Sequence, residues 1–218
     1  MFSSEFKLIK TFQSPHNDSS FGSASFSNRP LTSRFFNRPA SEVARDLLGK
    51  KLISTLGGRE TSGYIVETQA YTGAGDSESH IYRGKSSERV NWKPGSLYIY
   101  SIQGQVMLTF TTPSYEEGAC VLIRALQPID GLKTMERRRG PGTAHKLTKG
   151  PGNLSKALGI TVDLNGTNIF DGNEITVLSG YPLDGFQVVS RARLNCNKNP
   201  APLLRFYIDE NGWVTSPR

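Results

Sequence analysis

The chain has 218 residues, of which 36% are hydrophobic and 21% charged, enough for one sizeable hydrophobic core. Its 26 Lys and Arg residues outnumber 19 Asp and Glu residues, and the net charge of +7 favours a polyanionic partner, although modest basicity also serves solubility. No apolar run approaches the roughly twenty residues that span a bilayer, and the N-terminus lacks a signal-peptide core. We therefore expect an intracellular protein, not bound to a membrane, with one folded domain and a tail.

The cysteines and histidines do not have the spacing of a metal site. Cys120 and Cys196 are far apart and lie in no C-x-x-C motif, and His16, His80 and His145 form no cluster. The sequence therefore indicates neither a disulfide framework nor a bound metal.

Residues 1–30 are rich in Ser, Phe and Asn and show little hydrophobic periodicity. This composition is typical of a flexible extension outside the fold. Because acidic residues are few in this segment, an organellar targeting segment is the alternative. We expect the folded domain to span residues 31–218.

Within that domain the hydrophobic patterns predict few helices and many strands. Helices are expected at residues 39–49, 131–139 and 154–158. Strands are expected at residues 51–55, 62–71, 96–100, 106–111, 118–125, 174–178, 186–190, 204–208 and 213–215. Tight turns between neighbouring strands indicate antiparallel pairing, and the turn at residues 102–105 predicts a protruding β-hairpin. The expected class is α+β, a single domain with a predominantly antiparallel sheet or barrel-like core.

One predicted strand carries polar groups at regular spacing. Glu67, Gln69 and Tyr71 share one face of an extended chain, and the residues between them share the other. The pattern is typical of an edge strand with a solvated face, and also of a strand that presents functional groups to a site. Turn residues after Tyr71 and a second aromatic strand favour the second interpretation, because they would bring Tyr71, His80 and Tyr100 together.

Other features have both a structural and a functional interpretation. Arg124 lies in an apolar run, so its charge requires either an internal ion pair or a ligand. The Gly-rich residues 150–153 precede a helix, where backbone amides could bind an anion or simply form a turn. Basic side chains at residues 137–139 suit the C-terminal end of a helix, so they do not by themselves indicate DNA binding.

Several stretches, taken in order, resemble the alkyladenine (3-methyladenine, methylpurine) DNA glycosylases of mammals and many bacteria. The resemblance rests on residues 65–71 (Ile-Val-Glu-Thr-Gln-Ala-Tyr), His80, residues 93–100, 121–126, 150–152 and 204–207. Each stretch alone is a weak signal, but their common order is specific. The match covers roughly residues 31–218, which is essentially the whole expected domain.

The resemblance implies a monofunctional purine DNA N-glycosylase, a base-excision repair hydrolase that needs no cofactor. Such an enzyme flips a damaged purine out of the duplex and hydrolyses its N-glycosidic bond with an activated water. By the same resemblance, Tyr71, His80 and Tyr100 form the walls of the base pocket, and Arg124 supports the water site. The implied partner is double-stranded DNA carrying damaged purines, bound by a monomer.

The sequence departs from the family pattern at three positions. The general base of the family is a glutamate at the position of Gln69, and an amide cannot accept the proton of water. The side chain that wedges into the duplex aligns with Gln103, which stacks poorly. The asparagine of the pocket floor aligns with Phe110, or with Thr109 if the turn is one residue shorter.

Glu67 is present, but at about 7 Å along the strand it is too far from Gln69 to replace a base there, so we expect it to have a structural role. The sequence favours a DNA glycosylase for alkylated or deaminated purines whose activity is weakened or lost through Gln69. The alternatives are a catalytically silent lesion-binding protein and a basic module without a base pocket. The expected location is on DNA, in a nucleus or a bacterial cytoplasm, with organellar targeting by the tail as the alternative.

Overall fold

The strand that carries Glu67 and Gln69 is the centre of the sheet. In the computed structural model, the described residues are 29–73, 76, 92–112, 118–172, 174–179, 185–194 and 201–215. β1 (Lys51–Ser54) pairs with the first half of β2 (Thr61–Thr72), β8 (Arg205–Ile208) pairs with its second half, and β5 (Ala119–Asp130) runs along its other edge. Since both edges are paired, β2 is an interior strand rather than an edge strand.

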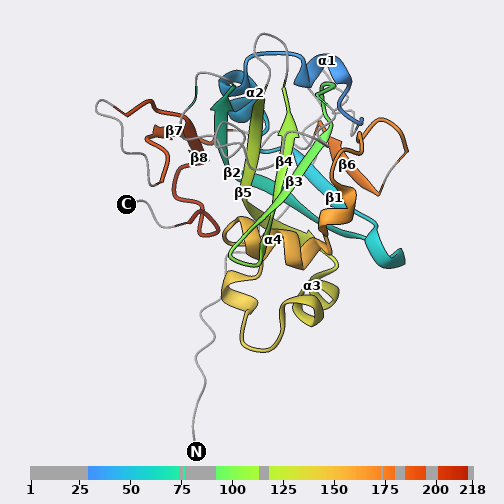
Figure 1. Ribbon diagram of the computed structural model, residues 1–218. Coiled ribbons are helices and arrows are strands. Elements are labelled where there is room, and N and C mark those ends of the chain that lie inside the picture. The colour runs from blue at the N-terminus through green and yellow to red at the C-terminus, as the bar shows by residue number, and fades with distance from the viewer. Residues whose placement is uncertain are drawn as a thin grey trace, which may run out of the picture.

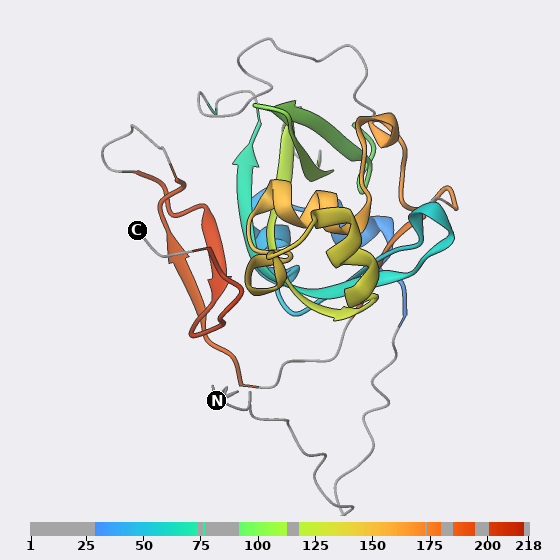
Figure 2. The ribbon, with the colours of Figure 1, turned by 90° about the horizontal axis from the view of Figure 1, so that it is seen from below.

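The remaining strands complete an antiparallel sheet that curls around the helices (Figures 1 and 2). They are β3 (Leu97–Ile102), β4 (Gln105–Thr111), β6 (Ile175–Leu178) and β7 (Val188–Arg191). The strand order is β3-β4-β5-β2-β1-β6, and β8 pairs with both β2 and β7. The expected α+β class, a single domain with a barrel-like antiparallel core, is confirmed.

The helices are short and cover the sheet. They are α1 (Ser33–Phe36), α2 (Ala40–Asp46), α3 (Leu132–Arg139) and α4 (Pro151–Leu158), with 3-10 turns η1 (Leu56–Gly58), η2 (Ala144–Lys146) and η3 (Val162–Leu164). α2 packs on β2, α4 packs on β4 and β5, and α3 packs on α4. α4 begins with Pro151, and Gly159, whose φ of 77° favours glycine, caps its C-terminal end. Within the described ranges, no helix is long and apolar enough to cross a membrane.

Three parts of the chain differ from the sequence-based expectation. β5 continues to Asp130, past the residues expected to lead into a helix, and the short helix α1 was not expected. Residues 213–215 do not form the expected strand. The backbone N–H of Thr215 bonds the Glu67 carboxylate instead of a neighbouring strand, so a buried charge replaces a strand partner.

The two faces of the sheet carry different side chains. The main apolar core contains Val66, Ala70, Leu108 and Phe110 together with the buried residues of α2 and α4. On β2 the Thr68 hydroxyl, between two of these core residues, donates to a backbone carbonyl of α2. A smaller cluster lies apart from this core, and its members are Tyr98, Tyr100, Met107, Cys120 and Leu122, with Tyr71 packed against them.

The predicted β3–β4 hairpin forms, and its tip rests beside α4. Gln103 and Gly104 make the turn with φ values of 50° and 73°, the left-handed conformation that two-residue hairpin turns require. Gln105 packs so closely on Gly152 of α4 that a Cβ at that glycine would lie 2.8 Å from the Gln105 Cβ. The hairpin is therefore held in place near its tip.

Candidate active site

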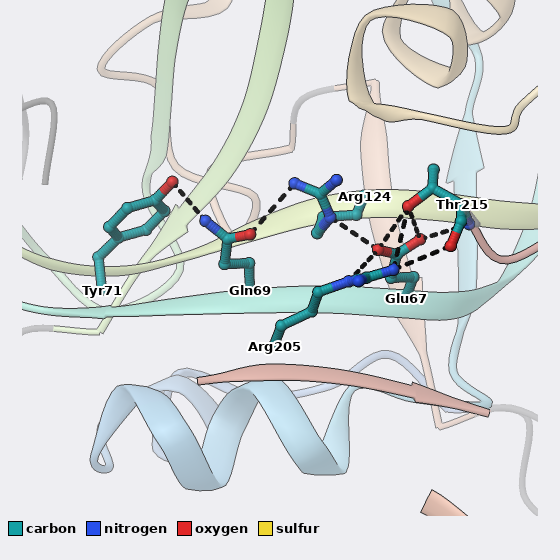
Figure 3. A network of polar contacts seen from close by, with 6 residues as sticks. All are labelled: Glu67, Gln69, Tyr71, Arg124, Arg205 and Thr215. Atoms are coloured by element: carbon teal, nitrogen blue, oxygen red, sulfur yellow. Dashed lines mark hydrogen bonds and ion pairs between the residues drawn. The ribbon is translucent and has the colours of Figure 1, made fainter. Parts of the chain in front are cut away.

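An irregularity in the β2–β5 pairing brings Arg124 to Glu67. The register passes over Val66 on β2 and Arg124 on β5, which have no directly opposed partner, and it is regular again from Thr68 onward. Irregularities of this kind change where a side chain points. Here the Arg124 guanidinium reaches the same face of the sheet as Glu67 and Gln69 (Figure 3).

The Glu67 carboxylate is fully buried and its two oxygens are occupied. Arg124 Nε and Arg205 Nε each donate to Oε1 at 2.7 Å. The Thr215 backbone N–H donates to Oε2 at 2.8 Å, and its hydroxyl lies 2.7 Å from both carboxylate oxygens. The ion-pair interpretation of Arg124 therefore holds, and Glu67 has the contacts of a structural residue.

The charges of this cluster do not balance. Burial by itself raises the pKa of Glu67, but the charge and hydrogen bond of Arg124 and the hydrogen bonds from Thr215 outweigh it and hold that pKa below 4.5. Glu67 is thus ionised at neutral pH. Two buried positive charges and one negative charge leave an excess of one positive charge next to Gln69.

Gln69 connects the charged cluster to Tyr71. Arg124 Nη1 donates to Gln69 Oε1 at 3.1 Å, and Gln69 Nε2 donates to the Tyr71 hydroxyl oxygen at 2.7 Å. Figure 3 shows Glu67, Arg124, Gln69 and Tyr71 as one continuous chain of polar contacts. Gln69 is 4% exposed, so these contacts are shielded from bulk water.

Beyond Tyr71 the polar chain meets stacked aromatic rings. Tyr98 and Tyr100 stack with centroids 4.9 Å apart and an interplanar angle of 29°. Burial raises the pKa of both Tyr71 and Tyr100, so both hydroxyls keep their protons at neutral pH. Tyr71 and Tyr100, two of the expected pocket residues, therefore belong to one cluster.

A buried ion pair supports Tyr71 from outside this cluster. The Arg193 guanidinium lies 4.9 Å from the centroid of the Tyr71 ring and donates to the Ala70 carbonyl at 3.2 Å. It is paired with Asp76 through both guanidinium η-nitrogens, with Nη2 at 2.7 Å from Oδ1. Asp76 in turn accepts from the Thr72 backbone N–H at 3.1 Å, so the end of β2 is fixed on several sides.

The other expected site residues lie elsewhere. Phe110 is fully buried in the main core, with its ring centroid 5.4 Å from that of Phe36. Thr109, the alternative residue, pairs with Tyr98 on β3 and Leu122 on β5, two members of the aromatic cluster. The structure does not bring Phe110 to the face of Tyr71, and β4 presents Thr109 there instead.

The expected wedge residue is at a tip, and His80 is not described. Gln103 occupies the turn of the β3–β4 hairpin, next to Ile102, which is 41% exposed. His80 and residues 1–28 of the expected extension lie outside the described residues.

Sequence reasoning missed four residues of the site: Asp76, Arg193, Arg205 and Thr215. Arg205 lay in a stretch used for the family resemblance, but its fully buried position opposite Gln69 depends on β8 pairing with β2. For Thr215 the sequence predicts a strand, which does not form. For Asp76 and Arg193 the sequence gives no signal, because residues 117 positions apart meet only after folding.

The fold is a curled antiparallel sheet, and inside it a chain of polar contacts joins a buried ion-pair cluster to stacked tyrosines. This combination defines the structural class of the protein. The chain belongs to the methylpurine-DNA glycosylase (MPG) family, whose pattern matches residues 34–212.

Individual relatives extend over nearly the same length. A Bacillus licheniformis protein named "Putative 3-methyladenine DNA glycosylase" is 35% identical over 195 residues, which cover 86% of this chain and 97% of the relative. A Methanoculleus marisnigri protein of the same name is 38% identical, covering 85% of this chain and 98% of the relative. An Encephalitozoon cuniculi protein named "Probable DNA-3-methyladenine glycosylase" is 37% identical, covering 83% and 90%.

Proposed function

We propose that this protein recognises damaged purines in double-stranded DNA by flipping them into a pocket beside Tyr71, and that Gln69 leaves it with weak N-glycosylase activity. Family membership supports DNA as the substrate and base excision repair as the process. The observation that carries the proposal is the polar chain from Arg124 through Gln69 to Tyr71, because it places groups for chemistry next to aromatic rings that can stack on a base.

The reaction requires a water oxygen to bond to C1′ of the sugar while the bond from C1′ to the base nitrogen breaks. A neutral base leaves with that bonding pair and gains a proton, whereas a cationic alkylated base takes the bonding pair and leaves neutral. In both cases the water loses a proton to the surroundings. A carboxylate at position 69 would accept the water proton and stabilise positive charge on the sugar. The Gln69 amide does neither, and the excess positive charge of the Arg124–Arg205–Glu67 cluster disfavours a cationic sugar.

Glu67 does not take over as the general base. Both of its oxygens accept hydrogen bonds, its side chain is inaccessible, and its lowered pKa makes it a weak proton acceptor. Activity therefore depends on substrates that leave easily, such as purines that carry a positive charge from alkylation.

The test restores the missing carboxylate. We expect Gln69→Glu to raise single-turnover release of hypoxanthine or 1,N6-ethenoadenine by at least about 10²-fold, the lower end of a general-base contribution. These neutral bases are poor leaving groups and need the activated water most, whereas 7-methylguanine should gain less.

Gln69→Ala serves as the matched control, since it removes the amide without supplying a base. If the Glu variant folds and binds lesion DNA but releases no base above the level of the Ala variant, the glycosylase proposal fails. The catalytically silent lesion-binding protein, which the amide at position 69 also favours, is then the function that remains.

We further propose that the protein acts as a monomer, on DNA inside the cell and not at a membrane, and without a cofactor. Its net charge of +7 supports a polyanionic partner. Residues 1–30 either form a flexible extension or direct the protein to an organelle. Comparing the location of the full chain with that of a chain lacking these residues distinguishes the two.

A further inference from the structure

The direction of the hydrogen bond between Gln69 and Tyr71 is fixed by Arg124. A guanidinium has only donors, so the Gln69 oxygen must face Arg124 Nη1, 3.1 Å away. The Gln69 NH₂ group then faces Tyr71 and donates to its hydroxyl oxygen at 2.7 Å. The opposite orientation of the amide would set two donors against each other at Arg124.

This orientation makes the Tyr71 hydroxyl an acceptor within the protein, so its own proton must point elsewhere. Among the described residues, Gln69 is the only hydrogen-bond partner of that hydroxyl. Arg124 Nη2 likewise has no acceptor within the described part of the chain, and Arg124 is 8% exposed. In Figure 3 the Tyr71 hydroxyl and the terminal Arg124 nitrogens lie along the same side of the Gln69 amide.

A glutamate at position 69 would reverse the bond. Its carboxylate has only acceptors, so the Tyr71 hydroxyl would have to donate to it and would have no proton left for a ligand. The exchange of one atom, nitrogen for oxygen, therefore decides whether Tyr71 offers its proton to the protein or to whatever occupies the site.

We propose that Gln69 makes Tyr71 a hydrogen-bond donor to the bound nucleotide, so that this site selects extruded purine nucleotides that present an acceptor atom to Tyr71. The inference rests on the proposed function, because the ligand is taken to be a flipped purine. It goes beyond that function by giving Gln69 a positive role in recognition and by making Tyr71 more than a stacking surface.

A double-mutant cycle tests this role. Tyr71→Phe, Gln69→Glu and the double variant are compared with the wild type for binding to a duplex that carries hypoxanthine on a 2′-fluorinated sugar, which resists cleavage, and to the undamaged duplex. We expect Tyr71→Phe to weaken lesion binding about 3- to 10-fold when residue 69 is Gln, the range for one neutral hydrogen bond, and less than about 2-fold when it is Glu. Binding to undamaged duplex should stay the same.

Tyr64→Phe is the matched control, because it removes a hydroxyl from the same strand away from the polar chain, and thermal unfolding of each variant checks the fold. An equal effect of Tyr71→Phe in both backgrounds, or no effect in the Gln69 background, would overturn the inference. Failure of the proposed function looks different: the wild type itself would then bind lesion and undamaged duplexes equally well.

Discussion

Glu67 has the most constrained side chain of the site, since two guanidinium groups and Thr215 depend on its charge. It lies two residues from Gln69, on the same face of β2, yet only position 67 requires a charged side chain. Glu67 must keep its charge because Arg124 and Arg205 are buried with it. Among the described residues, the Gln69 amide forms hydrogen bonds only with Arg124 Nη1 and Tyr71, so a carboxylate at this position would leave no other described polar group without a partner.

Removing the Glu67 charge should therefore destabilise the fold strongly. We expect Glu67→Gln to lower the free energy of unfolding by about 3 to 5 kcal/mol, because two buried guanidinium groups lose their counter-charge. Denaturant unfolding measures the change. Asp46→Asn is the control, since the Arg38–Asp46 pair is largely exposed and should be worth at most about 1 kcal/mol. Equal effects of the two substitutions would contradict a central role for Glu67.

Among the elements, the β3–β4 hairpin and α4 act together. The hairpin carries Gln103 at its tip and contributes Tyr98 and Tyr100 to the aromatic cluster, so its position matters both for the site and for the proposed contact with DNA. α4 fixes that position through the close approach of Gly152 to Gln105.

Gly152→Ala tests this packing because two effects on stability oppose each other. Alanine favours a helix over glycine by roughly 0.5 to 1 kcal/mol, but its Cβ would lie 2.8 Å from the Gln105 Cβ. We expect overpacking to win, with a net loss of about 1 to 2 kcal/mol in unfolding free energy and weaker binding to lesion DNA.

The matched control is Gly212→Ala, where a Cβ would meet nothing within 4 Å. It should change stability by no more than about 0.5 kcal/mol and leave DNA binding unchanged. A stabilising effect of Gly152→Ala would show that the hairpin moves freely over α4.

For the whole molecule, the buried charges predict how stability responds to acid. The pKa of Glu67 is lower in the folded protein than its ordinary value of 4.5. Burial raises this pKa, but Arg124 and Thr215 together lower it by more than burial raises it. The pKa of Asp130 is also lowered, by its hydrogen bonds with Ser62 and Lys51. A lowered pKa means that the unfolded chain binds protons first, so this stabilisation is complete above about pH 4.5 and is lost as the pH falls through the folded values.

We expect the free energy of unfolding to change little between about pH 7 and pH 5 and to fall below about pH 4.5. In Glu67→Gln the decline should be smaller, because one of the carboxylates with a lowered pKa no longer titrates. Chemical denaturation at a series of pH values measures both curves. If the two proteins lose stability in parallel, Glu67 is not the group responsible.

The sequence by itself determined the local elements and the family. Alternation on one strand placed Glu67, Gln69 and Tyr71 together on one face, and turn residues located the hairpin, because strand periodicity and turn chemistry act over a few neighbouring residues. The amide at Gln69, where the family motif has a glutamate, is likewise a property of the sequence alone.

Only the tertiary structure decided what those residues touch. The irregular β2–β5 register aims Arg124 at Glu67, the β8 pairing brings Arg205 to the same carboxylate, and the chain end folds back so that Thr215 bonds Glu67 rather than forming a strand. The face of β4 that carries Phe110 turned out to be the main core, because the register of the hairpin sets the phase of its alternation. These contacts join residues far apart in the chain, and no local pattern encodes the direction in which one hydrogen bond between Gln69 and Tyr71 must run.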